Sequence, residues 1–227
     1  MFANTFAYPR KSIMFRPFET ATPTRGTPSS LTDRTRTLLA DIERDWRMVS
    51  GMDRVPSQSA VDPARLHEAL PYCFVLGQTA ANSLRVRVAG QKLHDALRLD
   101  PRGMRFCGFF AEPVRPTISA LLDSVMQTPA ILEVPLLVQR GFARRPVAAQ
   151  LLAMPLRDPA GEITRIMGAI VPCERLQGQA VQFDIATDRT IRHDPLETGL
   201  VDRRTPAIDQ GMPVARRGGL RLVVDNG

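Results

Sequence analysis

The chain has few of the residue types on which most metalloproteins and disulfide-rich proteins depend. Its 227 residues include three histidines, three cysteines and one tryptophan. Cys73, Cys107 and Cys173 lie far apart in apolar surroundings and form no CxxC pair, which argues against a disulfide framework and against a zinc site. We predict that all three are buried thiols.

Catalytic motifs are missing as well. No HExxH, GxSxG, GxxxxGK or GxGxxG spacing occurs, and His67, His94 and His193 lie on short helices or in a polar tail. No nucleophile, metal cluster or acid–base pair can be assembled from this sequence. We therefore predict a protein that is not an enzyme, with no catalytic, metal-binding or cofactor-binding residues.

Long hydrophobic runs are absent too. The longest apolar segments, such as 163–172, are far shorter than the ~20 residues that a membrane-spanning helix needs. Residues 1–30 lack the apolar core and cleavage site of a secretory signal. These features predict a cytoplasmic protein with no membrane partner.

The formal net charge of +7 raises the question of nucleic acid. The basic excess is spread along the chain, and Lys11 and Lys92 are its two lysines. Nucleic-acid recognition favours a basic stripe on one face, or aromatic residues interleaved with basic ones, and neither pattern is present. Nucleic-acid association is therefore the last of the function classes that we consider.

The chain divides into an arm, a domain and a tail. Residues 1–31 hold many Thr, Ser and Pro positions without periodicity, which predicts a disordered arm. The domain is expected over 32–176, and 177–227 is expected to be a largely disordered tail. Within the tail, the apolar run Gly219-Leu-Arg-Leu-Val-Val-Asp is either a strand added to the sheet edge or a peptide that docks onto a partner.

An amphipathic helix opens the domain, with Thr32 as its N-cap and Gly51 as its end. Its apolar face packs on its own sheet, forms a homodimer or partner seam, or does both. That face comprises Leu38, Leu39, Ile42, Trp46 and Val49.

Five segments have the alternation or the β-branched character of strands, namely 72–77, 84–88, 131–139, 146–156 and 163–172. Between the second and third, residues 112–128 form a helix with one apolar stripe that needs a sheet to cover. The sum is an α+β architecture: a five-stranded antiparallel sheet with helices packed on one face, preceded by the amphipathic N-terminal helix.

The order of several landmarks carries a resemblance. In chain order they are Trp46 on a helix, Leu70-Pro-Tyr before the first strand, Ala89-Gly90 after the second, Gly108-Phe-Phe, Met154-Pro-Leu and Met167-Gly. Over 41–176 this arrangement is similar to the PAS-like domain family of stand-alone alphaproteobacterial proteins, long catalogued as a domain of unknown function. The resemblance implies a PAS fold and a regulatory role, and its fold agrees with the one derived from periodicity.

Two cofactors known in PAS relatives are not expected. A haem sensor would need an axial ligand, usually on the long helix, and 112–128 contains no histidine. Flavin-binding light sensors of the superfamily carry a cysteine in an Asn-Cys-Arg-Phe-Leu-Gln run. Here the asparagine is missing and Cys107 follows the Arg-Phe pair. We expect Cys107 to fill space beside Phe106, Phe109 and Phe110.

The space between sheet and helices is either a solid core or a cavity for a small apolar ligand. Its inward-facing positions are predicted to be Val86, Val88, Phe106, Phe110, Leu122, Leu136, Leu152, Met154 and Met167. Two function classes follow. The first is a regulatory module that acts through protein partners of unknown identity, and the second is a small-molecule sensor whose occupancy shifts its surface conformation.

Overall fold

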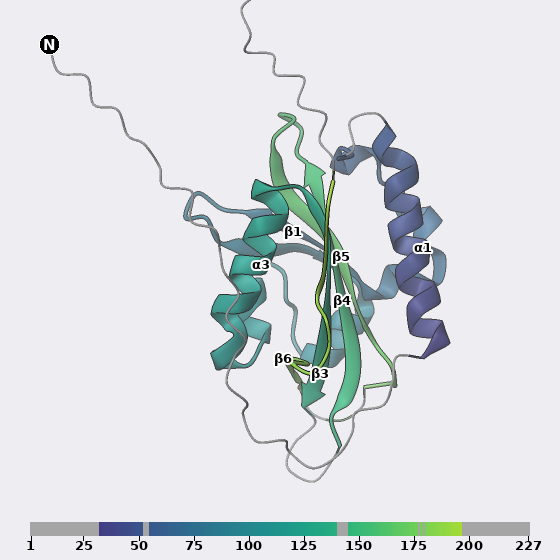
Figure 1. Ribbon diagram of the computed structural model, residues 1–227, viewed down its shortest axis with the longest axis vertical. Coiled ribbons are helices and arrows are strands. Elements are labelled where there is room, and N and C mark those ends of the chain that lie inside the picture. The colour runs from purple at the N-terminus through teal and green to yellow at the C-terminus, as the bar shows by residue number, and fades with distance from the viewer. Residues whose placement is uncertain (1–31, 52–54, 140–144, 177, 179, 197–227) are drawn as a thin grey trace, which may run out of the picture. The chain divides into compact units, whose positions relative to one another are not determined.

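The computed structural model describes residues 32–51, 55–139, 145–176, 178 and 180–196 (Figure 1). An antiparallel sheet with the strand order β2-β1-β5-β4-β3-β6 forms its centre. The bounds are β1 Cys73–Gln78, β2 Leu84–Ala89, β3 Ala130–Gln139, β4 Val147–Arg157, β5 Ile163–Pro172, β6 Gln182–Ile185 and β7 Arg192–Pro195. The predicted α+β class is confirmed, and the five predicted strands end within a residue of their expected positions.

Two further strands lie in the segment that the sequence analysis assigned to the tail. β6 and β7 pair antiparallel with different halves of β3, so the sheet has seven strands and continues beyond Leu176. Phe183 anchors β6 in the core, whereas β7 carries no apolar side chain except Pro195. Four-residue strands are too short for a recognisable alternation, which explains why the predicted boundary at residue 176 was wrong. The arm 1–31 and the apolar run near the C-terminus lie outside the described residues.

The N-terminal helix α1 (Asp33–Ser50) begins and ends as predicted. The Thr32 hydroxyl accepts a hydrogen bond from the Thr35 backbone N–H at 3.2 Å, and Gly51 follows the helix with φ 53°. Trp46 is 2% exposed, and its indole Nε1 donates to the Pro155 carbonyl oxygen of β4 at 3.1 Å. The apolar face of α1 therefore packs on its own sheet.

The long helix α3 (Arg115–Gln127) covers the other face of the sheet, as Figure 1 shows. Ile118, Leu122 and Val125 on its apolar stripe are fully buried against that face. The expectation of helices on one face is thus incomplete, because α1 and α3 lie on opposite faces. Two apolar clusters result, one beneath each helix.

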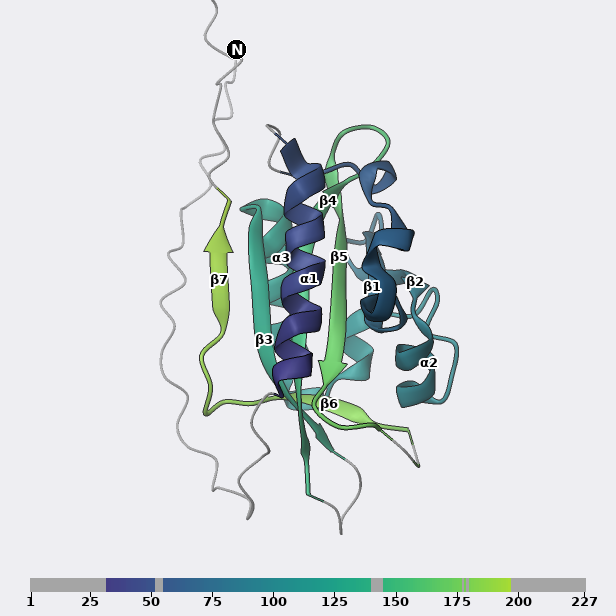
Figure 2. The same ribbon diagram turned by 90° about the vertical axis from the view of Figure 1, so that its right-hand side faces the viewer.

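Short helices connect these elements, and their bounds are η2 Gln58–Ala60, η3 Pro63–Tyr72, α2 Gln91–Leu97, η4 Phe106–Phe109 and η5 Glu112–Val114. In η3, the Asp62 carboxylate caps the first turn by accepting the Ala64 N–H at 2.9 Å. The segment then kinks at His67, whose φ is 40° and ψ −117°. Figure 2 shows α1 in front of the sheet, with η3 and α2 beside it.

Candidate functional site

The space beneath α3 is filled by aromatic side chains. The Phe106 ring centroid lies 4.7 Å from that of Phe74, 6.0 Å from that of Phe109 and 5.6 Å from that of Phe110. Phe183 extends the group, with its centroid 5.7 Å from that of Phe110. Since a buried aromatic ring is the bulkiest way to fill a core, these five rings leave close-packed material where a PAS-type ligand cavity was considered.

The nine residues predicted to line one cavity do not lie together. Five belong to the cluster beneath α3, namely Val86, Phe106, Phe110, Leu122 and Leu136. Three belong to the cluster beneath α1 on the opposite face, namely Leu152, Met154 and Met167. Val88 is 53% exposed. The prediction that these nine residues line one cavity is therefore wrong, because they belong to two separate clusters and one of them lies on the surface.

A bulge explains the position of Val88. In the β1–β2 register, Leu76 lies opposite Val86 and Val75 lies opposite Val88, so β2 has one extra residue, Arg87, between the pairs. An extra residue reverses the alternation of the strand, so Val88 leaves the face of Val86. The sequence shows only an unbroken Leu-Arg-Val-Arg-Val pattern and gives no sign of the bulge.

Helices cover both faces of the sheet, and this explains why Leu152, Met154 and Met167 were wrongly assigned to the face beneath α3. β4 is buried at ten consecutive positions from Val147 to Leu156, because α1 covers one face and α3 the other. A strand buried on both sides loses its alternation of apolar and polar residues. The sequence of β4 therefore could not indicate which residues point toward α3.

The predicted dimer seam on α1 is turned inward. Leu38, Leu39, Ile42 and Trp46 are buried beneath the helix, and Val49 is half-buried. The partly exposed Val49 lies at the end of this face. With these side chains packed on the sheet, the cis arrangement accounts for the amphipathic pattern of α1.

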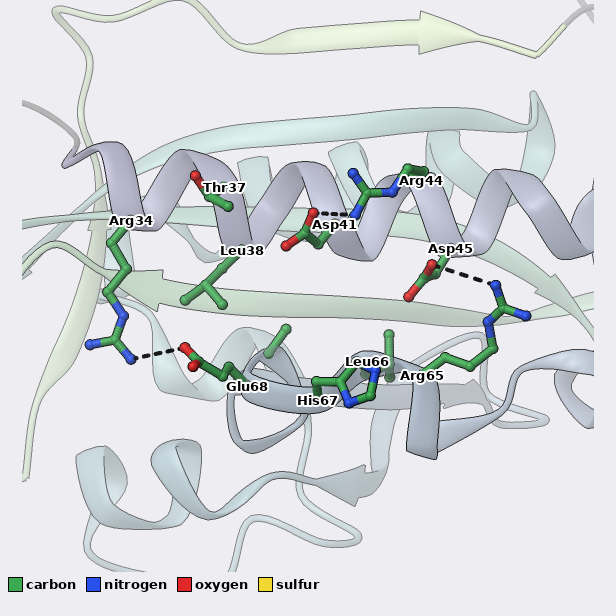
Figure 3. Close-up of a pocket in the computed structure, with 11 residues that line it drawn as sticks. Arg34, Thr37, Leu38, Asp41, Arg44, Asp45, Arg65, Leu66, His67 and Glu68 are labelled. Atoms are coloured by element: carbon green, nitrogen blue, oxygen red, sulfur yellow. Dashed lines mark hydrogen bonds and ion pairs between the residues drawn. The ribbon is translucent and has the colours of Figure 1, made fainter.

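A groove lies between α1 and η3, with a volume of about 660 Å³ (Figure 3). Arg34 of α1 and Glu68 of η3 form an ion pair across it, with Nη2 and Oε2 3.7 Å apart. Asp45 and Arg65 form a second pair at 3.9 Å, and Asp41 binds Arg44 along the helix. The groove could not be predicted from the sequence, because residues from two segments with a turn between them create it only when the helices pack.

The groove is balanced in charge. Each of its three arginines is within ion-pair distance of one carboxylate, and such solvent-exposed pairs contribute little to stability, roughly 0–1 kcal/mol each. His67 borders the groove with an exposed side chain and left-handed φ. The lining of the groove therefore has no excess of either charge.

A second, smaller pocket of about 210 Å³ lies at the C-terminal end of α3. Its lining comprises Gln78, Asn82, Asp123, Met126, Gln127 and Ile163. Burial raises the pKa of the Asp123 carboxyl above its usual range. Neither this pocket nor the groove includes any of the nine residues predicted to line a cavity.

The histidines and cysteines are dispersed. His94 Nδ1 lies 3.9 Å from the Asp100 carboxylate, and His193 Nε2 lies 3.2 Å from the Ser124 hydroxyl oxygen. Cys73 is buried and its thiol donates to the Ala69 carbonyl oxygen, whereas Cys107 and Cys173 are half-buried, contrary to the expectation of full burial. Among the described residues, no three His, Cys, Asp or Glu side chains gather as a metal site would require.

A polar network at the edge of the sheet was also missed by the sequence analysis. Arg192 of β7 contacts Glu43 of α1 at 2.5 Å, Glu133 of β3 at 3.0 Å and Asp194 at 3.1 Å. Gln150 joins it by donating to Glu133 at 3.3 Å. One arginine thus links a helix, a central strand and an edge strand that are distant in sequence.

The chain belongs to the PAS domain family, whose model matches residues 34–171. PAS domains are sensory and signalling modules and are generally non-catalytic, so the protein is a module of the signalling class. No curated protein matches the sequence at a significant level. Within the part of the chain that the structure describes, no helix is long and apolar enough to cross a membrane.

Several solved structures are similar in part. A light-oxygen-voltage domain studied with a flavin analogue shares 18% identity, covers 49% of this chain and 83% of its own, and has a TM-score of 0.38. A domain of a putative light- and redox-sensing histidine kinase from Haloarcula marismortui shares 18% identity over 49% and 97%, with a TM-score of 0.32. An RNA-binding light-oxygen-voltage receptor shares 16% over 48% and 31%, with a TM-score of 0.34. At TM-scores this low, these likenesses carry no argument about the function of this chain.

Proposed function

We propose that this PAS domain is a non-enzymatic regulatory module that acts through protein–protein contacts in bacterial signalling. The supporting observation is the filled interior beneath α3. Val86, Phe106 and Phe110 there are 0% exposed, and Leu122 and Leu136 are 1% exposed. A signal that does not enter through a ligand in this space has to be received and passed on at the surface.

Native mass spectrometry of the full-length protein purified from its cells tests this proposal. We expect the mass of the polypeptide alone, or a whole multiple of it, because the interior already holds its own side chains. Extra mass that disappears on denaturation would overturn the proposal in favour of a small-molecule sensor. The same spectrum reports the number of subunits.

A core variant sharpens the test. Phe106→Ala removes the ring that contacts three others, and in a close-packed core this substitution leaves a cavity at a cost of about 3–5 kcal/mol. We expect the variant to be less stable and, like the wild type, to carry no bound compound. A compound that co-purifies with the wild type and is lost in this variant would instead place the ligand beneath α3.

A further inference from the structure

Three arginine side chains gather around Gly77 on one face of the sheet. Gly77 of β1 lies opposite Arg85 of β2 on one side and opposite Arg165 of β5 on the other. Directly opposed residues project from the same face of a sheet, so these two arginines share a face. Arg87 joins them, because its Nε lies 2.8 Å from the point where a Cβ on Gly77 would stand.

The absence of a side chain at Gly77 is what admits Arg87. The β1–β2 bulge places Arg87 as the extra residue of β2, and its guanidinium end then lies over the glycine. Arg87 is exposed, while Arg85 and Arg165 are half-buried. The strand register places Arg85 and Arg165 on this face, and the bulge and the glycine together add Arg87 as a third cation.

Neutral partners hold these side chains in position. Arg85 Nη1 donates to the Gly103 carbonyl oxygen at 2.6 Å, and Arg165 Nη1 donates to the Gln58 side-chain oxygen. Among the described residues, no carboxylate lies within ion-pair distance of Arg85, Arg87 or Arg165. Arg85 and Arg165 are thus fixed in place without an ion pair, unlike the arginines of the groove between α1 and η3.

Two neighbouring charged residues, one basic and one acidic, border this positive surface. Arg105 pairs with Arg85 through an isolated bridge and is exposed. Asp158 is a negative group near its margin. The hydrogen bond from Thr164 chiefly lowers the pKa of the Asp158 carboxyl, and the charge of Arg165 adds to the effect. Asp158 also accepts two backbone N–H groups of its own turn, so its carboxylate is already engaged.

Apolar side chains adjoin the arginines. Val75 and Val88 lie directly opposite each other in the register, and Val75 shares the face of Gly77 because it is two residues away on β1. Val88 is 53% exposed, whereas a β-branched apolar residue in a strand is ordinarily covered. The surface therefore combines three cations, two of them held by hydrogen bonds, with an uncovered apolar contact.

We propose that this arginine face, formed by Arg85, Arg87 and Arg165, binds an acidic segment of a partner protein. Carboxylates of the segment would pair with the guanidinium groups, and an apolar side chain of the segment would cover Val88. The inference rests on the proposed role in protein–protein contacts and names the chemistry of the partner. Arginine is well suited to this role because its planar fork binds a carboxylate through two hydrogen bonds.

A protein segment fits the face better than a nucleic acid does. Single-stranded nucleic acids are usually held by aromatic rings on which bases stack. The phenylalanine rings described near this sheet are buried in the interior, as Phe74, Phe106 and Phe110 illustrate. A valine beside the arginines offers a contact for an apolar side chain and no stacking surface for a base.

Fluorescence anisotropy with a fluorescein-labelled peptide of alternating Glu and Leu tests the proposal on the full-length protein. We expect saturable binding that weakens as NaCl rises from about 0.05 to 0.3 M, because exposed charges are screened. The double variant Arg85→Gln/Arg87→Gln is expected to weaken binding by about tenfold or more. A matched double variant, Arg36→Gln/Arg175→Gln, removes two exposed arginines elsewhere and is expected to change binding less than about twofold.

Gly77→Ala gives a variant without any change of charge. The added Cβ takes the place of the Arg87 guanidinium end, and the φ of Gly77 is one that alanine adopts. We expect weaker peptide binding with an unchanged melting temperature, since a flexible side chain is all that has to move. Arg85→Gln/Arg87→Gln also removes the hydrogen bond from Arg85 to Gly103 and could loosen the neighbouring loop. Gly77→Ala keeps that bond, so it tests the arginine face without this side effect.

Three outcomes would overturn the inference. Equal losses in the two double variants would mean unspecific attraction to a basic protein. Full binding by Gly77→Ala together with Arg85→Gln/Arg87→Gln would place the contact elsewhere. Tighter binding of single-stranded DNA than of the peptide, lost in the same variants, would replace the protein segment by nucleic acid. A co-purifying small molecule in native mass spectrometry would refute the proposed function independently of all three.

Discussion

Gly168 of β5 is a position at which no side chain larger than hydrogen has room. A Cβ at this residue would lie 2.2 Å from the Leu152 carbonyl oxygen and 2.6 Å from Cζ of Phe74. The first contact is with backbone, which cannot turn aside as a flexible side chain can. The Met167-Gly pair that helped to indicate the family therefore has a steric basis in this fold.

Gly168→Ala is accordingly expected to destabilise the protein by about 1–3 kcal/mol or more, the usual range for overpacking a core. Gly108→Ala is the control, because nothing lies within 4 Å of a Cβ there and its φ is not positive. Urea unfolding measures both. A Gly168→Ala midpoint equal to that of Gly108→Ala would contradict the close packing of β5 against β4 and Phe74.

Cys73 differs from the other two cysteines in its surroundings. Burial raises the pKa of its thiol to about 12, so almost none of the reactive thiolate is present near neutral pH. We expect iodoacetamide at about pH 8 to label Cys107 and Cys173, which are half-buried, well before Cys73. Peptide mass spectrometry of the native protein measures the order. Early labelling of Cys73 would mean that η3 opens readily from the sheet.

β7 illustrates how an element can depend on charge more than on apolar burial. Its residues are exposed or half-buried, and besides its backbone pairing with β3 it is held by ion pairs of Arg192 with Glu43 of α1 and Glu133 of β3. Burial acts to raise the pKa of Glu43, but hydrogen bonds from Arg192 and then Arg47 outweigh it and lower the pKa. Burial raises the pKa of Glu133, and Arg192 offsets only part of that rise.

Arg192→Met should therefore leave two half-buried carboxylates without their shared cation. We expect a loss of about 1 kcal/mol near neutral pH, a value reduced for solvent screening because Arg192 is 38% exposed. In the wild type, the lowered pKa of Glu43 contributes stability above its unfolded pKa and loses it as pH falls. In the variant, Glu43 keeps Arg47 but loses the larger effect of Arg192, and the pKa of Glu133 rises further above its unfolded value, so stability falls as pH increases through that pKa.

The deficit of Arg192→Met relative to the wild type is thus expected to be larger at about pH 8 than at about pH 5. Chemical unfolding at the two pH values measures it. Arg36→Met, which changes an exposed arginine of α1 that pairs with Asp33, serves as a comparison. A deficit that does not depend on pH would show that Arg192 acts through packing of its stem and not through Glu43 and Glu133.

At the scale of the whole molecule, α1 and the sheet share one buried cluster. The cluster joins Ile42 and Trp46 of α1 to Leu152, Met154 and Met167 of the central strands. Removing the helix would expose these side chains, so α1 is part of the domain core. The PAS match begins at residue 34, within this helix.

Trp46 gives a direct test, because it is the one tryptophan of the chain. We expect blue-shifted emission that acrylamide quenches poorly, and an unfolding curve by fluorescence that coincides with the curve by circular dichroism. A fluorescence change at lower denaturant concentration would mean that α1 leaves the sheet before the domain unfolds. Deletion of residues 1–31, which removes nothing of α1, is the matched control.

Periodicity in the sequence was enough to predict the two long helices, the five main strands and the α+β class. The apolar stripes of α1 and α3 recur at helical spacing, and the Thr32 cap and Gly51 end follow from local chemistry. The five main strands lie within a residue of their predicted bounds because turn residues separate them. These features depend on neighbouring residues, and a sequence shows its neighbours directly.

Only the tertiary structure decided which face each strand residue occupies and which charges meet. The Arg87 bulge reverses Val88, and the double coverage of β4 divides Leu152 and Met154 from the residues beneath α3. Arg192 meets Glu43, and Arg165 meets the face of Gly77, across long stretches of chain. Register, bulges and helix placement are set by packing between distant segments, so the groove and the arginine face exist only once the chain has folded.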